Sequence, residues 1–318
     1  MSRLVVLDFD GTMTNAEAEG VPFRQGYLED VATLTGRPVP EILTLAERFE
    51  REVADAPDAY GWMFNGKIVA PATVDPYLRI MPVARKIFDH VGAFPREEDR
   101  SRLLDGILYK YNYQKTVVAF RPDARDFLLW LGQQAGLETY VVTNSHTEPV
   151  RQKIARLGML KPGQTTVSSL NDGSTPDMSP ANPLYWLLER VHGRAQKYVI
   201  DEAFQGVPES MHLPGLSRPV LLRRRHYVEA LTNLLSRHGL GWTDLTVVGD
   251  IFELDLSLPL SLGASVVLVT NAHTPAYERA FVQAHPRGFL ADALGQARAF
   301  LATGGTVPST ARPGVEGG

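Results

Sequence analysis

Two aspartates stand two residues apart directly after the first apolar segment of the chain. Asp8 and Asp10 follow Leu4 to Leu7, and Gly11 comes next. A strand would present Asp8 at its carboxyl end, where ligands bind in doubly wound sheets, and Gly11 would let the backbone turn there. One carboxylate could attack as a nucleophile while the other acts as general acid and then as general base. The alternative, a strand ending in an Asp-Gly turn, accounts for Gly11 but not for both aspartates.

A second acidic cluster follows the apolar segment that begins at Leu245. Asp250 comes first, and Glu253 and Asp255 follow it. Magnesium prefers oxygen ligands, so the side chains of Asp8 and Asp250, with the carbonyl of Asp10, would suffice to bind it. Glu253 and Asp255 would then bind waters of the metal or hold a basic residue. The alternative is an acidic helix N-terminus favoured by the helix dipole.

Phosphate chemistry also needs a hydroxyl and a cation at strand ends. Thr143 follows the apolar segment Tyr140 to Val142, and with adjacent N–H groups it could bind a phosphoryl oxygen. Arg223 to Arg225 follow Val220 to Leu222, and one of them would stabilise negative charge on Asp8 and on the phosphoryl group. For Thr143 the alternative is a turn residue at the strand end. For the three arginines it is a run of charges in contact with solvent.

Two histidines, His146 and His226, stand beside these motifs. A histidine at a strand end is more often a turn or helix-cap residue than a proton donor. We therefore assign neither of them a role.

Short apolar runs that alternate with helical patterns position these residues. We expect strands at 4–7, 140–142, 198–200, 220–222, 245–248 and 265–269, with helices at 123–134, 148–157 and 227–238. This alternation predicts an α/β fold, with a Rossmann-like three-layer core built on a parallel sheet. We assign residues 1–14 and 115–302 to that core.

Three segments depart from the alternation. Residues 15–114 are mostly helix-like and predict an inserted helical cap domain. Residues 171–219 are rich in Pro, Gly and Ser, with one helix expected at 183–191, and predict a flap on the core. Residues 303–318 have almost no apolar anchors and predict a disordered tail.

Composition narrows the choice of partner and compartment. The chain has 318 residues and a formal net charge of −4, spread without long like-charge blocks. This disfavours nucleic acid as a partner, since a broad basic face is its usual footprint. It has no Cys, which excludes a thiolate nucleophile or a Cys-ligated metal. No signal-peptide core or run of about 18 apolar residues is present, so we expect no membrane partner and a cytoplasmic location.

Taken in order, the four motifs resemble those of the haloacid dehalogenase (HAD) superfamily. They are Asp8 to Thr12, Thr143 with Asn144, the trio Arg223 to Arg225, and Gly249 to Asp255. The resemblance covers the core, and it is most specific for the first and fourth motifs. Many such enzymes carry a helical cap directly after the first motif, where residues 15–114 stand.

This resemblance implies a role for each motif residue. Asp8 would be the nucleophile that forms an aspartyl-phosphate, and Asp10 would protonate the leaving oxygen and later activate water. Gly11, Thr12, Thr143 and Asn144 would bind the phosphate. Dehalogenase members lack an aspartate two residues after the nucleophile, so Asp10 favours phosphoryl chemistry.

The third motif departs from the family pattern, which usually has Lys. The family's usual spacing between the third and fourth motifs selects Arg225, with Arg223 and Arg224 as alternatives and Lys197 as a more distant one. Arg keeps the charge but offers a planar fork of donors instead of a point charge.

The motifs together predict a magnesium-dependent phosphatase that acts on a small phosphorylated metabolite through an aspartyl-phosphate. One alternative is a phosphomutase of the same superfamily, whose cap would hold the product for rephosphorylation. The other is a catalytically silent member that binds a phosphate ligand or a protein partner.

Overall fold

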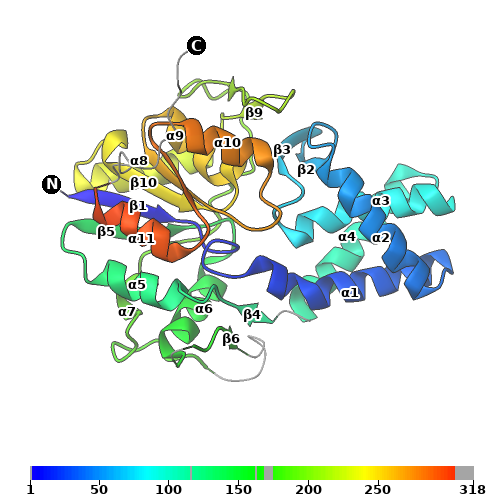
Figure 1. Ribbon diagram of the computed structural model, residues 1–318, viewed down its shortest axis with the longest axis horizontal. Helices are drawn as coiled ribbons and strands as arrows, with labels where there is room; N and C mark the ends of the chain where they lie inside the picture. The colour runs from blue at the N-terminus through cyan, green and yellow to red at the C-terminus, as the bar shows by residue number, and fades with distance from the viewer. Residues whose placement is uncertain (1, 115–116, 162, 168–174, 305–318) are drawn as a thin grey trace, which may run out of the picture.

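A computed structural model describes residues 2–114, 117–161, 163–167 and 175–304. Its centre is a six-stranded sheet in the order β12-β11-β10-β1-β5-β7, and all of its pairings are parallel (Figure 1). The strands are β1 (Arg3–Leu7), β5 (Leu137–Val142), β7 (Val191–His192), β10 (Leu245–Gly249), β11 (Ser265–Val269) and β12 (Gly288–Ala291).

Helices cover both faces of this sheet because its central strands are apolar on both sides. In β1, Val5 and Leu7 pack with α5 (Ala124–Gly132), α6 (Thr147–Met159), α7 (Tyr185–Leu188) and α11 (Leu294–Ala302). Leu4 and Val6 point the other way and pack with α8 (Arg225–His238), α9 (Ser257–Ser261) and α10 (Ala276–Ala284). The core is therefore a three-layer, Rossmann-like α/β sandwich, and the predicted fold class is confirmed.

An inserted helical unit follows β1. Its helices are α1 (Ala16–Thr35), α2 (Val39–Ala54), α3 (Pro76–Val91) and α4 (Glu97–Gln114), and they bury a hydrophobic cluster of their own. Asn15 caps α1 by accepting a hydrogen bond from the N–H of Ala18 at 3.1 Å. The unit also contains an antiparallel hairpin, β2 (Gly61–Phe64) and β3 (Lys67–Pro71), which we did not predict.

The segment between β7 and α8 differs from the prediction. The expected strand at 220–222 is β9 (Val220–Leu221), which pairs antiparallel with β8 (Ser210–Met211) outside the main sheet. Residues 198–200 form no strand, and the place beside β5 belongs to β7. Of the apolar residues that indicated these strands, Val220 and Leu222 are buried against α8, whereas residues 198–200 are only partly buried.

Other predicted elements differ in extent. The helix expected at 183–191 is only α7, and a further antiparallel pair joins β4 (Val118–Ala119) to β6 (Thr166–Val167). Two short helical segments flank β10: η1 (Trp242–Asp244) and the π-helix η2 (Phe252–Leu256). Of the predicted tail at 303–318, all but residues 303 and 304 lie outside the described residues.

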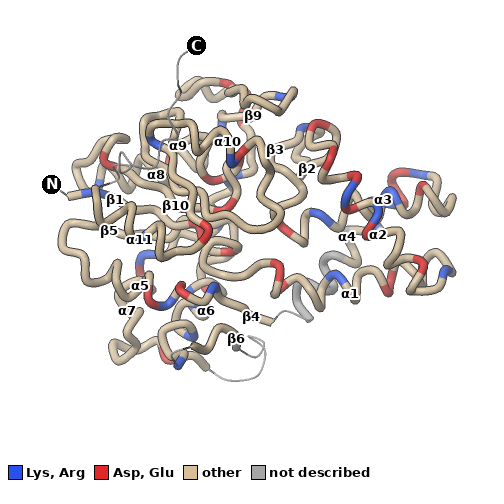
Figure 2. The backbone as a smooth tube through the Cα atoms, viewed as in Figure 1, with Lys and Arg blue, Asp and Glu red and all other residues tan. Residues whose placement is uncertain are grey.

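Charged residues of both signs are interspersed along the chain (Figure 2). Across the described ranges, we find no helix with the length and apolar character needed to cross a membrane.

Candidate active site

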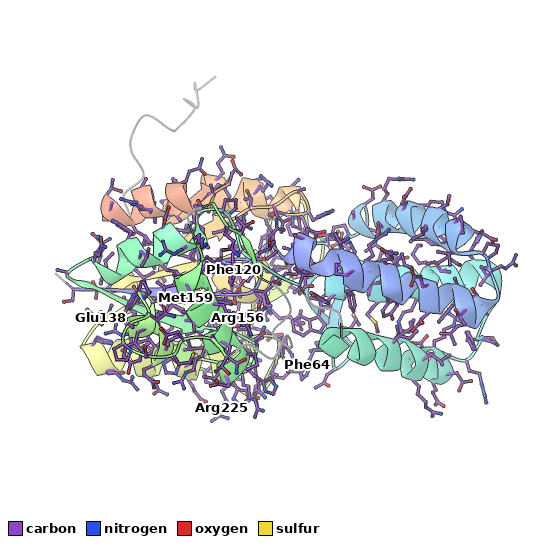
Figure 3. All side chains as sticks on the ribbon, turned by 90° about the horizontal axis from the view of Figure 1, so that it is seen from below. Phe64, Phe120, Glu138, Arg156, Met159 and Arg225 are labelled. Atoms are coloured by element: carbon purple, nitrogen blue, oxygen red, sulfur yellow. The ribbon has the colours of Figure 1, made fainter. Side chains whose placement is uncertain are left out.

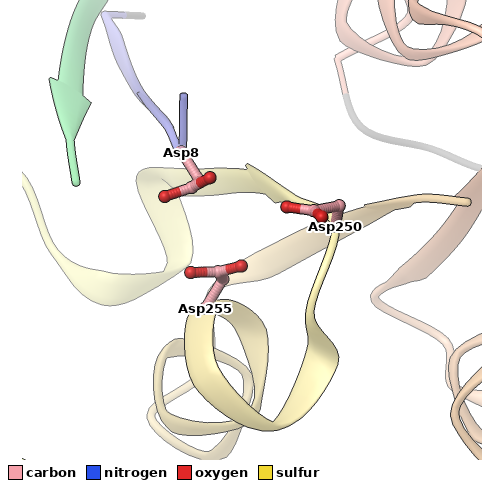
Figure 4. A group of neighbouring side chains, drawn as sticks. All are labelled: Asp8, Asp250 and Asp255. Atoms are coloured by element: carbon pink, nitrogen blue, oxygen red, sulfur yellow. The ribbon is translucent and has the colours of Figure 1, made fainter. Parts of the chain in front are cut away.

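Three carboxylates converge at the carboxyl ends of two adjacent strands. Asp8 follows β1, Asp250 follows β10 and Asp255 lies in η2, so all three point into one space (Figure 4). One oxygen of each lies within 4.8 Å of the others, and the residues are only 7, 3 and 2% exposed. Parallel pairing of β1 with β10 brings Asp8 and Asp250 together across 242 residues of sequence, because Leu7 stands beside Val248.

Lys197 is the cation of this cluster. Its Nζ donates to Asp8 Oδ1 at 2.7 Å and to Asp255 Oδ1 at 2.8 Å, and its side chain is 1% exposed. Burial lowers the pKa of Lys197, but the charges of Asp255 and Asp8 outweigh burial and raise the pKa above its ordinary value. Burial raises the pKa of Asp8 from 3.8 to about 7, against the opposing charge of Lys197.

The turn after Asp8 is shaped by close approach to Asp250. Gly11 has a φ of +84°, and a Cβ at that position would lie 2.2 Å from Asp250 Oδ2. Only glycine adopts this positive φ readily and also leaves the space that Asp250 occupies. The Thr12 hydroxyl lies within hydrogen-bonding distance of both Asp250 Oδ1, at 2.9 Å, and Asp8 Oδ2, at 3.2 Å, so Thr12 bridges two of the predicted metal ligands.

Both oxygens of Asp10 are held by residues of the core. Lys153 Nζ donates to Oδ1 at 2.7 Å, and the Ser145 hydroxyl donates to Oδ2 at 2.6 Å. Burial raises the pKa of Asp10, but Lys153 and Ser145 outweigh burial and leave the pKa below its ordinary value. Asp10 is therefore an ionised carboxylate at neutral pH. We did not identify Lys153 or Ser145 from the sequence.

The second motif lies between Asp10 and Lys197. Thr143 is 2% exposed, and its hydroxyl accepts a hydrogen bond from the N–H of Ser145 at 3.2 Å. The Asn144 side-chain oxygen accepts one from the N–H of Lys197 at 2.8 Å. Asn144 therefore fixes the backbone that carries the lysine.

The predicted cation Arg225 does not reach the carboxylate cluster. Its side chain is 53% exposed, and it pairs with Glu229 at 2.9 Å and with Asp201 at 3.5 Å (Figure 3). The choice of Arg225 is wrong because the apolar residues 220–222 belong to a separate ribbon, so the residues after them do not stand at an end of the main sheet. Lys197, the distant alternative, occupies the place beside Asp8.

The other two arginines of the trio have different surroundings. Arg223 donates to the carbonyl of Glu202 near the surface. Arg224 is fully buried and donates to the carbonyls of Lys197, Leu221 and Val69, so one arginine of the trio does point inward. Its target is the backbone of the lysine, not Asp8.

The fourth motif divides its acidic residues between two functions. Asp255 binds Lys197, whereas Glu253 accepts two hydrogen bonds from Arg218, at 2.7 and 2.8 Å. Tyr277 also donates to Glu253 at 2.8 Å. The expectation that these residues hold a basic partner therefore fits both, with different partners.

The carboxylate cluster suits a divalent cation. Asp8, Asp250 and Asp255 together carry more negative charge than Lys197 neutralises, and burial together with Asp8 and Asp255 raises the pKa of Asp250 well above its ordinary value. A divalent cation bound by Asp8 and Asp250 would relieve this repulsion, and all of the donors are oxygen atoms, as magnesium prefers.

No protein-family model matches the sequence, and no curated protein matches it. Several solved structures resemble the fold, however. One is described as a predicted phosphoglycolate phosphatase from Haemophilus somnus, with 15% identity, coverage of 95% of this chain and 97% of that one, and a TM-score of 0.49. A HAD hydrolase from Bacillus subtilis bound to magnesium has 12% identity, coverage of 95 and 99%, and a TM-score of 0.46.

An L-2-haloacid dehalogenase is a third similar structure, with 11% identity, coverage of 95 and 100%, and a TM-score of 0.40. At these identities the similarity concerns the fold alone, and the neighbours include both a phosphatase and a dehalogenase. The chemistry must therefore be argued from the side chains of this chain.

Proposed function

We propose that the protein is a HAD-type phosphohydrolase that uses magnesium and hydrolyses a small phosphate monoester through an aspartyl-phosphate on Asp8. The observation that carries the proposal is the buried Asp8 carboxylate, bound to Lys197 at 2.7 Å and grouped with Asp250 and Asp255. A site for one nucleophile, one divalent cation and one fixed positive charge is what phosphoryl transfer requires. Magnesium, held by Asp8, Asp250 and the Asp10 carbonyl, would neutralise charge on the phosphoryl oxygens.

The reaction would proceed in two halves. In the first, an oxygen of Asp8 forms a bond to phosphorus while the bond to the leaving oxygen breaks, and Asp10 gives that oxygen a proton. In the second, Asp10 takes a proton from water, the water oxygen bonds to phosphorus, and the bond to Asp8 breaks. Phosphate is released and both aspartates return to their starting forms.

The state of Asp10 fits the second half directly, since a base must be ionised to take a proton from water. The first half needs Asp10 protonated. The negative charge of a phosphate entering beside Asp10 would raise its pKa and so favour that form. Thr143 and Lys197 would contact the phosphoryl oxygens, which accumulate charge in the transition state.

The proposal is tested by release of phosphate from an aryl phosphate in the presence of magnesium. We expect Asp8→Asn to abolish turnover while the fold is retained, because an amide oxygen cannot serve as the nucleophile. Asp126→Asn is the matched control, since this aspartate on α5 is 79% exposed. Undiminished turnover in Asp8→Asn would refute the proposal, and isomerisation of a sugar phosphate without free phosphate would indicate a mutase instead.

A further inference from the structure

Lys153 is a partly buried cation that the four motifs leave without a role. It lies on α6, with a side chain that is 17% exposed, and its Nζ is 2.7 Å from Asp10 Oδ1. Its neighbours on the helix, Arg151 and Gln152, pair instead with Glu189 and Glu148 in exposed positions. Of these three consecutive side chains, Lys153 is the one that contacts the first motif.

The ammonium of Lys153 is itself held from a second side. Glu19, on the first turn of α1, lies 3.8 Å from Lys153 Nζ and is 6% exposed. The Glu19 carboxylate also accepts a hydrogen bond from the N–H of Ala119 at 3.2 Å. Lys153 therefore lies between Asp10 and an anchored carboxylate, which limits the positions its flexible side chain can take.

Lys153 and Ser145 together define the plane of the Asp10 carboxylate. Each binds a different oxygen, at 2.7 and 2.6 Å, so rotation of the carboxylate would break at least one bond to a fixed partner. A carboxylate has about four lone-pair sites, so two remain for a leaving oxygen or a water. A proton-transfer group held in this way can act without first being ordered by the substrate.

We propose that Lys153 is a positioning residue for proton transfer, which fixes the carboxylate of Asp10 toward the leaving oxygen of the phosphate ester. This role rests on the proposed function, because Asp10 acts as an acid that Lys153 can position only if the protein cleaves such esters. Glu19 supports the role by holding the ammonium of Lys153.

The leaving group separates this role from a purely structural one. Dinitrophenolate leaves without help from an acid, whereas an alkoxide such as that of glycerol phosphate needs a proton. The value of kcat/KM reports the steps through the first phosphoryl transfer. A loss of folded enzyme lowers kcat/KM for both esters by the same factor, but a misplaced acid lowers it for the alkyl ester alone.

The experiment compares the wild-type protein with Lys153→Met, Lys153→Arg and Asp10→Asn on 2,4-dinitrophenyl phosphate and on glycerol phosphate, with magnesium. We expect Lys153→Met to lower kcat/KM about 10- to 100-fold for glycerol phosphate, part of the 10²–10⁴ that general acids contribute, and less than about threefold for the dinitrophenyl ester. Asp10→Asn should show the same pattern more strongly. Lys153→Arg should recover part of the loss.

The control is Lys161→Met, because Lys161 is exposed just beyond the end of α6 and should leave both values unchanged. An equal loss on the two esters in Lys153→Met, or none on glycerol phosphate, overturns the positioning role while the proposed function stands. If the wild-type protein releases phosphate from neither ester, the proposed function fails and the role of Lys153 falls with it.

Discussion

Replacing Lys197 with methionine should destabilise the protein far more than the same change at Arg225. Lys197 is 1% exposed and binds Asp8 and Asp255, whose side chains are 10 and 2% exposed. Removing one partner of a buried ion pair costs about 3–5 kcal/mol, because the remaining charge has neither water nor a counter-ion. The side chain of Arg225 is 53% exposed, so solvent screens its two ion pairs and Arg225→Met should change the unfolding free energy far less.

The cost in Lys197→Met should grow with pH. Lys197 lowers the pKa of Asp8, so without the ammonium Asp8 would bind a proton more tightly, and a protonated carboxyl costs less to bury. For each unit by which the substitution raises the pKa of Asp8 above its wild-type value, the variant loses about 1.4 kcal/mol more than the wild type once the pH passes that raised pKa. The difference in unfolding free energy from the wild type should therefore be larger at pH 8.5 than at pH 6.

Urea unfolding followed by circular dichroism measures this difference, with a chelator present so that metal does not compensate. Equal slopes of free energy against urea would show that the variants unfold to similar states. Adding magnesium should restore part of the loss in Lys197→Met, since a divalent cation can take over the neutralising role. A cost below about 1 kcal/mol for Lys197→Met, or an equal cost for Arg225→Met, would refute the placement of Lys197 as the buried cation.

Three further perturbations address the same site. Gly11→Ala should lower the unfolding free energy by about 1–2 kcal/mol, because alanine disfavours the left-handed backbone of Gly11. Its Cβ should also displace Asp250, so magnesium should raise the melting temperature less than in the wild type. An unchanged shift of the melting temperature by magnesium would contradict this. Arg224→Met should lower the unfolding free energy by about 3 kcal/mol, because its three carbonyl partners lose a charged donor, and urea unfolding measures it. Without metal, the stability contributed by Asp8 is fully present below about pH 4 and is lost as pH rises through about 7, by up to about 4 kcal/mol. Asp8→Asn should lack this part of the pH dependence, which urea midpoints from pH 4 to 8 would reveal.

The sequence was sufficient for the parts of the site that regular strands carry. β1 and β10 are continuous apolar runs buried on both faces, and Asp8 and Asp250 follow them directly. Two strands that pair in parallel must bring such residues to one edge of the sheet. This is why Asp8 and Asp250 could be placed together before the structure was known.

Lys197 was harder to predict because irregular backbone carries it. β7 has only two residues, and Arg194 and Gln196 adopt positive φ values of 56 and 48° just before the lysine. A segment of this kind has no period in its hydrophobic pattern, and left-handed residues other than glycine leave no clear sequence signal. The stronger apolar run at 220–222 therefore drew the prediction to Arg225.

Lys153 escaped prediction for a different reason. It is one of several charged and polar residues on α6, and charges on an exposed helix face usually contact water. Its ion-pair partners Asp10 and Glu19 come from the turn after β1 and from the first turn of α1, far from Lys153 in sequence. Ser145 had a weak signal, since it stands next to Thr143 and Asn144 in the second motif.

The two proposed catalytic aspartates are each bound by a lysine, and both lysines have contacts that lead to the inserted helical unit. Lys153 approaches Glu19 on α1. The carbonyl of Lys197 accepts from Arg224, whose guanidinium also donates to Val69 on the β3 strand of the hairpin. The geometry of the site is therefore determined jointly by the core and by the insertion. This explains why motifs read along the core alone identified the carboxylates, but gave Lys197 only as a distant alternative and missed Lys153.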